Sequence, residues 1–151
     1  MASIESQIES LKAQTGSLEA NVINMVCQHI VVVIAGRLEQ GLKELFLEHV
    51  RTSKGTGLDR AVTRLCGSFQ NPKPEKIFEL IDLFDRTASQ ALREEWSQES
   101  EEVSQTLKAL ITTRINIAHQ KNRSNNVTIE SVQSFYSAYR TTLRRVDELV
   151  N

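Results

Sequence analysis

Apolar residues recur along most of this chain at intervals of three and four, the spacing of a helix with one buried face. The longest such stretch runs from Leu18 to about Arg51, with apolar positions at Val22, Val26, Ile30, Ile34, Leu38, Leu42 and Leu45. Taken alone, "IVVVIA" within it could form a strand, because β-branched residues favour strands. No second strand-like run exists in the sequence to pair with it. We therefore expect one long helix, with Gly36 and Gly41 as weak points or close-packing positions.

Shorter stretches with the same period predict further helices on either side of the long one. Ser17 is a candidate N-cap for the long helix, Pro74 suits a first helical turn, and Thr128 is a candidate N-cap for the last helix. "TSKGTG" and "QKNRSNN" read as loops, and "GSFQNPKP" as a break. The expected shorter helices cover residues 4–14, 58–66, 74–96, 103–119 and 128–150.

The predicted fold class is all-α, a mostly antiparallel helical bundle of about five to six helices. Helices joined by short polar loops favour this architecture. With 151 residues, 40% of them hydrophobic and 25% charged, the chain is long enough to bury a core as a soluble globular protein. We expect a single domain over residues 1–151.

Charge is unevenly distributed, although the formal net charge is only −1. Residues 103–151 hold seven Lys/Arg against three acids, and residues 75–102 hold nine acids against three bases. Such runs usually form solvated helix faces, so an affinity for nucleic acid would have to come from a local patch. The basic half nevertheless contains the motif that carries the candidate chemistry.

The cysteines and the N-terminus limit the choice of compartment and cofactor. Cys27 and Cys66 lie far apart, without the spacing of a metal site, so we expect two free thiols, no metal and no cofactor. The N-terminus "MASIESQIES" lacks the basic and apolar regions of a secretory signal. The longest wholly apolar run, residues 30–36, is too short to span a bilayer. We therefore expect a cytoplasmic protein with no membrane partner.

The stretch "LITTRINIAHQ" places Arg114 and His119 five residues apart. At about 100° a residue, they lie about 140° apart around a helix, so they converge only if the helix ends near His119. The polar tail after His119 predicts such an end. An arginine can fork two hydrogen bonds onto a phosphate, and an imidazole can transfer a proton near neutral pH.

This stretch resembles the Arg-x4-His motif of the HEPN superfamily (higher eukaryotes and prokaryotes nucleotide-binding domain), and most closely the prokaryotic RiboL-PSP type. The specific likeness covers about ten residues, whereas the architecture covers most of the chain. The resemblance implies a metal-independent RNA endonuclease that works as a homodimer, with two motifs facing each other in a composite site. His119 would activate the ribose 2′-OH or protonate the leaving oxygen, and Arg114 would bind the scissile phosphate. Toxins and phage-defence effectors occur in the family, so an antitoxin protein is a further implied partner.

One departure from the family leaves two readings open. The family places a polar residue, often Asn, directly after the arginine, whereas this chain has Ile115 there and Asn116 one place on. Asn116 is then either a shifted supporting residue or a sign that the domain has lost catalysis. The alternative function is a non-catalytic RNA- or nucleotide-binding module, or a helical module that assembles with another protein.

Three charged residues are candidates for a supporting role. Glu39 could orient His119, or it could pair with Lys43 one helical turn later. Lys121 and Arg123 flank the motif and could hold neighbouring RNA phosphates, or they could be ordinary loop charges.

Overall fold

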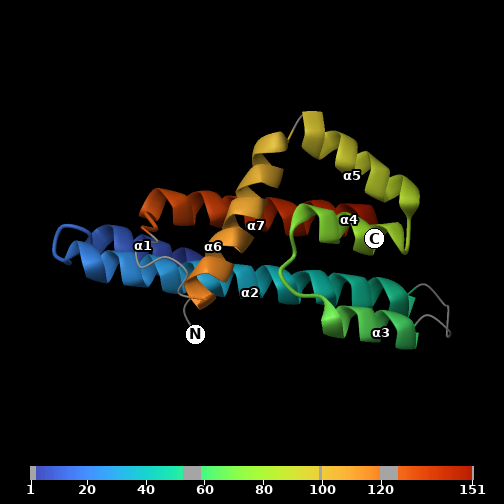
Figure 1. Cartoon of the computed structure of the whole chain (residues 1–151), viewed down its shortest axis with the longest axis horizontal. Helices are drawn as coiled ribbons and strands as arrows, with labels where there is room; N and C mark the ends of the chain where they lie inside the picture. Colours follow the sequence, from blue (N-terminus) through green and yellow to red (C-terminus); the bar gives the residue numbers. More distant parts are fainter. Residues whose placement is uncertain (1–2, 53–58, 99, 120–125, 151) are drawn as a thin grey trace.

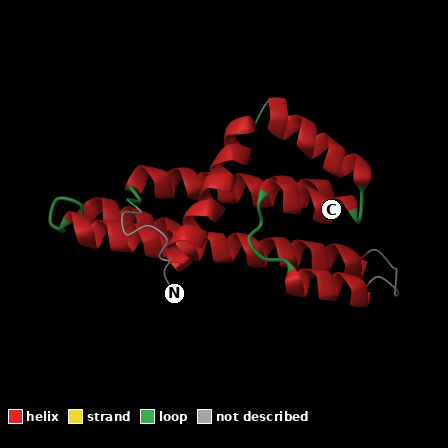
Figure 2. Ribbon diagram, viewed as in Figure 1, coloured by secondary structure: helices red, strands yellow, loops and turns green. Residues whose placement is uncertain are grey.

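The computed structural model describes residues 3–52, 59–98, 100–119 and 126–150. Figure 2 shows helices and loops in these residues and no strand, so the predicted all-α class is confirmed. The loops expected after Thr52 and after His119 lie mostly outside the described residues. The helices are α1 (Ile4–Gln14), α2 (Ala20–Thr52), α3 (Asp59–Ser68), α4 (Pro74–Asp82), α5 (Arg86–Gln98), α6 (Glu101–His119) and α7 (Ile129–Val150).

Helix α2 is the common packing partner in this bundle, since α1, α3, α6 and α7 all contact it. Figure 1 shows α1 folded back along the first half of α2 and α3 along its end. Helix α6 crosses the bundle and returns the chain to the end where α2 begins. Helices α1 and α3 run antiparallel to α2. Helix α7 runs in the same direction as α2.

The core forms along the face of α2 that carries the helical apolar period. Phe46 is fully buried in this face and stacks on Phe84, with ring centroids 5.5 Å apart. A Cβ at Gly41 would lie 2.9 Å from Leu143 Cδ1 of α7, so a glycine here lets the two longest helices approach closely. The buried α2 residues are Cys27, Ile30, Val31, Ile34, Ala35, Leu38, Leu42, Phe46 and Val50.

Helix α2 is also long and apolar enough, by length and composition alone, to cross a membrane. The core helix of a globular bundle has the same composition, because one of its faces packs against other helices. In this chain that face is covered by α6 and α7. The cytoplasmic location therefore remains a prediction.

Two local predictions were wrong. Ser17 does not cap α2, because its hydroxyl donates to the Gln14 carbonyl at 2.9 Å and so closes the end of α1. The stretch expected as one helix from Pro74 is two helices, α4 and α5. The Asp85 carboxylate accepts hydrogen bonds from the backbone N–H groups of Thr87 and Ala88, at 2.8 and 3.0 Å. This is an N-cap, and the apolar period continues across the break because both helices pack on one core.

We expect the Asp85→Ala substitution to lower the free energy of unfolding by about 1 kcal/mol, because it removes the acceptor for the first N–H groups of α5. Asp85→Asn is the matched control and should lose much less, since its amide oxygen can still accept these bonds. Urea unfolding followed by circular dichroism measures both. Equal losses for the two variants would show that the cap does not stabilise the break.

Candidate functional site

Helix α6 presents the Arg-x4-His motif on its last turns. Glu101 and Glu102 in the first turn suit the positive end of the helix dipole. Leu107, Leu110 and Ile111 are fully buried and fix the rotation of the helix on the core. The next turn, residues 113–117, is half-buried throughout. The motif therefore begins where α6 leaves the core.

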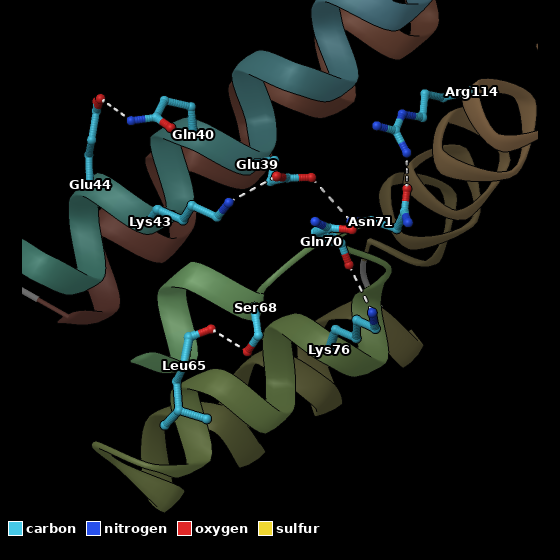
Figure 3. A network of polar contacts seen from close by, with 10 residues as sticks. All are labelled: Glu39, Gln40, Lys43, Glu44, Leu65, Ser68, Gln70, Asn71, Lys76 and Arg114. Carbon is cyan, nitrogen blue, oxygen red and sulfur yellow. Dashed lines mark hydrogen bonds and ion pairs between the residues drawn. The ribbon is translucent and has the colours of Figure 1, made fainter. Parts of the chain in front are cut away.

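The Arg114 side chain belongs to a polar network that joins three parts of the chain (Figure 3). Its Nη1 donates a hydrogen bond to Oδ1 of Asn71, in the segment between α3 and α4. The Asn71 backbone N–H donates to Oε2 of Glu39 on α2 at 3.3 Å. Lys43 Nζ donates to the other Glu39 oxygen at 2.9 Å. These contacts fix where the guanidinium of Arg114 lies.

Asn71 is the residue of this network that the sequence did not reveal as part of a site. Its φ of 53° is left-handed, a conformation that Asn tolerates better than most residues with a Cβ. Its carbonyl accepts from the Lys73 N–H at 2.8 Å, which tightens the turn into α4. The stretch "QNPKP" signals a turn, because Asn and Pro favour turns. Nothing local to it indicates that the Asn71 amide faces an arginine on α6.

Glu39 pairs with Lys43, four residues further along α2. The predicted pair with Lys43 is confirmed, and the two side chains are only 21% and 19% exposed. Glu39 makes no hydrogen bond or ion pair with His119 in the described chain. It instead reaches Arg114 through Asn71.

His119 is the last residue of α6 and is exposed to solvent. The predicted end of the helix near His119 is therefore confirmed. Because α6 is continuous from Arg114 to His119, the two residues lie about 140° apart around the axis and about 7.5 Å apart along it. Arg114 is held toward Asn71. A single chain therefore does not bring the two motif residues together.

The residues between Arg114 and His119 are mainly packing residues. Ile115 lies one turn beyond Ile111 on the same stripe, and both Ile115 and Ile117 pack against the core. Asn116 is half-buried, and its side chain makes no hydrogen bond to any described residue. Packing on the core thus explains why Ile115, and not a polar residue, follows Arg114. Lys121 and Arg123 lie outside the described residues.

The other reactive side chains among the described residues form no second candidate catalytic site. Cys27 and Cys66 are free and buried, as expected, and burial raises the pKa of both thiols. The thiolate, which is the reactive form, is therefore disfavoured at neutral pH. Within the described part of the chain, no group of three or more His, Cys, Asp or Glu residues could hold a metal ion.

A cleft of about 600 Å³ lies between α1 and α7. Tyr136 and Tyr139 line it with their rings stacked, the centroids 5.8 Å apart. The Arg140 guanidinium lies 5.9 Å from the Tyr136 ring centroid, and Glu5 and Glu9 face the cleft from α1. Burial raises the pKa of Tyr139. The half-buried tyrosines thus pack on each other, and Glu9 on the α1 side of the cleft forms an ion pair with Lys12 at 2.8 Å.

Two substitutions at Asn71 separate its backbone role from its side-chain role. We expect Asn71→Ala to lower the free energy of unfolding by about 1–3 kcal/mol, because it loses the bond to Arg114 and forces Ala into a left-handed conformation. Asn71→Gly should lose about 1 kcal/mol less, since Gly adopts this φ freely. Thermal and urea unfolding measure both variants. If Ala and Gly were equally destabilising, the backbone conformation would carry none of the cost.

Comparison with protein-family models, with characterised proteins and with solved structures gives no match for this chain. What the chain does must therefore be inferred from its own residues. The Arg114–Asn71–Glu39 network and the exposed His119 are the features on which that inference rests.

Proposed function

We propose that this protein is a metal-independent RNA endonuclease of the HEPN type, acting as a homodimer with a composite Arg-x4-His site. The observation that carries the proposal is the contrast between two residues of one helix. Arg114 is held in place by a network that reaches two other segments, whereas His119 is exposed at the helix end. A held cation and an accessible imidazole are the two groups that cleavage at a ribose phosphate requires.

Arg114 would bind the scissile phosphate. A guanidinium has five N–H donors, and the bond to Asn71 uses one nitrogen of this group. The remaining donors can fork onto two phosphate oxygens and stabilise the charge that develops there in the transition state. Glu39 does not compete for this cation directly, because its oxygens accept from Lys43 and the Asn71 N–H.

His119 would transfer the protons. As a neutral imidazole, it takes the proton of the ribose 2′-OH while the 2′ oxygen attacks the phosphorus. The bond from phosphorus to the 5′ oxygen breaks, and the protonated His119 of the second copy gives its proton to that oxygen. The products are a 2′,3′-cyclic phosphate and a 5′-OH. Two copies are needed because Arg114 and His119 diverge within one chain.

In this proposal the protein acts in the cytoplasm on RNA, without a cofactor. A role as a toxin or phage-defence effector, restrained by an antitoxin protein, is the family setting in which such an activity is used. The basic residues of the C-terminal third would supply the general affinity for the RNA backbone.

A second candidate function is a non-catalytic module that binds RNA or a nucleotide. Ile115 favours it, because this residue packs on the core where the family carries a polar helper. Asn116, one place on, makes no hydrogen bond in the described chain. In this case Arg114 would bind a phosphate without any cleavage following.

We expect the wild-type protein to cleave a mixed RNA pool in the presence of a chelator and to leave 2′,3′-cyclic phosphate ends. His119→Ala should reduce the rate about 100- to 10,000-fold, because it removes the proton-transfer group. Arg114→Ala should reduce it about 100- to 1,000-fold through lost stabilisation of the phosphate charge. Gel analysis of end-labelled RNA measures the rates and identifies the ends.

Arg86→Ala is the matched control, because Arg86 is exposed on α5 and should leave the rate unchanged. Loss of activity in this control would point to a general charge effect. A folded wild-type protein that binds single-stranded RNA without cutting it, with binding weakened by Arg114→Ala, would favour the non-catalytic module. If neither cleavage nor binding responded to Arg114 or His119, both functions would be wrong.

A further inference from the structure

The cleft between α1 and α7 is built from residues that the candidate site does not use. It encloses about 600 Å³, within the range of about 300–1,000 Å³ that small-molecule sites occupy. Helix α1 contributes Glu5, Ile8 and Glu9 to the lining, and α7 contributes the rest, from residues 133–144. None of them belongs to the network that holds Arg114. The cleft is therefore a separate place for a ligand.

Aromatic surface is the first part of this lining that suits a ligand. Tyr136 and Tyr139 are half-buried, and their rings lie at 26° to each other with the centroids 5.8 Å apart. Neither hydroxyl makes a hydrogen bond with a described residue. Ile8 and Leu143 add aliphatic surface to the same cleft. A planar ring system that enters the cleft can therefore stack on a tyrosine and also leave water.

Two arginines are the second part of the lining. Arg140 and Arg144 lie four residues apart, so both extend from the same side of α7. The Arg140 guanidinium lies 5.9 Å from the Tyr136 ring centroid and makes no ion pair with a described residue. Arg144 pairs only with Glu148, at 3.8 Å between two exposed side chains, and such a pair is weak. Both guanidinium groups therefore keep donors that can fork onto the oxygens of a phosphate.

The α1 side of the cleft supplies a hydrogen-bond acceptor. Glu5 is exposed in the first turn of α1, and its carboxylate makes no hydrogen bond or ion pair with a described residue. Glu9, one turn later, already accepts from Lys12 at 2.8 Å. An ionised carboxylate can only accept hydrogen bonds, so Glu5 selects a ligand that carries N–H or O–H groups. The cleft thus combines aromatic rings, an anion-binding pair and one acceptor that the fold leaves unused.

We propose that this cleft binds a guanine nucleotide. The base stacks on the rings of Tyr136 and Tyr139. The Glu5 carboxylate accepts from the Watson–Crick edge of the base, and Arg140 and Arg144 hold the phosphate.

The two oxygens of a carboxylate select guanine among the four bases. Guanine presents two adjacent donors on its Watson–Crick edge, N1–H and the N2 amino group, so each oxygen of Glu5 receives one hydrogen bond. Adenine and cytosine place an acceptor nitrogen beside their single amino group. Uracil places its one N–H between two carbonyl oxygens. In these three bases a lone pair faces one of the carboxylate oxygens, and the contact is repulsive.

The same lining disfavours simpler ligands. A small organic cation would be repelled by Arg140 and Arg144, and the Arg140 guanidinium already lies near the Tyr136 ring. An inorganic phosphate alone would leave the tyrosine rings without a partner, and it would be repelled by the charge of Glu5. A nucleotide places its negative charge and its N–H donors at opposite ends of one molecule. This polarity matches arginines on α7 and a carboxylate on α1.

A guanine nucleotide can reach the cleft as a free mononucleotide or as an unpaired guanosine of an RNA strand. A guanine within a duplex uses its Watson–Crick edge for pairing, so only a single-stranded guanosine can donate to Glu5. The inference does not rest on the proposed nuclease, because Arg114 and His119 take no part in the cleft. If the guanosine belongs to an RNA, the cleft adds a contact to the substrate of that nuclease.

Isothermal titration calorimetry of the full chain with GMP and AMP tests the reading of the base. We expect GMP to bind at least about tenfold more tightly than AMP. Glu5→Gln should weaken GMP binding at least about tenfold, because the amide has one acceptor oxygen and turns an NH2 group toward the donors of guanine. Glu19→Gln is the matched control, since Glu19 is exposed immediately before α2 and does not line the cleft. It should leave the Kd unchanged.

Comparison of GMP with guanosine, which has no phosphate, tests the arginines. A variant with both Arg140→Gln and Arg144→Gln should bind GMP at least about tenfold more weakly and guanosine within about twofold of the wild type. Both side chains are exposed, so circular dichroism should show an intact fold. Arg86→Gln, at an exposed position on α5, controls for the loss of positive charge. An equal effect of the double variant on GMP and guanosine would contradict a phosphate contact.

Substitution of one tyrosine tests stacking. Tyr136→Leu should weaken GMP binding at least about fivefold, whereas Tyr136→Phe should stay within about twofold of the wild type, because it keeps the ring. Thermal unfolding shows whether the leucine variant keeps its fold. If it does not, Tyr136→Phe and the exposed Glu5 and arginine positions still carry the test.

A single-stranded tetramer, 5′-UUGU-3′ with 2′-O-methyl riboses, separates the two sources and cannot be cut by attack of a 2′-OH. Tighter binding of the tetramer than of GMP, with both weakened by Glu5→Gln, would identify RNA as the source. Equal or weaker binding would identify the free nucleotide. The cleft is rejected if neither ligand binds at millimolar concentration, if AMP binds as well as GMP, or if neither the Glu5 nor the arginine variants change the Kd.

Nucleotide binding and RNA cleavage are read separately, so each idea can fail alone. Binding of GMP that responds to Glu5→Gln in a protein that never cleaves RNA would support the cleft and reject the nuclease. RNA cleavage that depends on Arg114 and His119, in a protein that binds neither GMP nor the tetramer through the cleft, would do the reverse.

Discussion

Burial of the core face of α2 is the interaction on which the rest of this molecule depends. Four helices pack against this one helix, and Ile34, Leu38 and Phe46 on it are completely buried. Removal of apolar area from water is the largest favourable term in folding, so the position of α6 and α7 follows from this face. Gly41 allows α7 to lie close enough for that packing. Arg114 reaches its partners because α6 is held across α2.

The packing of α6 on the core positions the candidate site more than the site's own polar contacts do. Ile111 and Ile115 set the rotation of α6 on the core, and the rotation directs Arg114 toward the segment between α3 and α4. There Asn71 links the arginine to Glu39, so one hydrogen-bonded path joins α2 to α6. His119 lies beyond the last anchored turn and takes no part in the network. The cation is therefore positioned by the fold, while the imidazole faces solvent.

The two faces of α2 explain why so apolar a helix belongs to this bundle. One face packs in the core of the chain, whereas Val22, Met25 and Val32 on the other face are exposed. From Ala20 to Gly36 the helix contains no Asp, Glu, Lys or Arg.

The sequence by itself determined the all-α class, the bounds of most helices, and the end of α6 at His119. These features depend on apolar spacing, caps and breaks within a few residues of each other. It missed the break at Asp85, because apolar residues keep their period across it. Only the tertiary structure decided that Arg114 meets Asn71, 43 residues away, and that Asn71 meets Glu39, 32 residues away. Such contacts depend on how helices cross, and no periodicity along one helix encodes the residue that its neighbour will present.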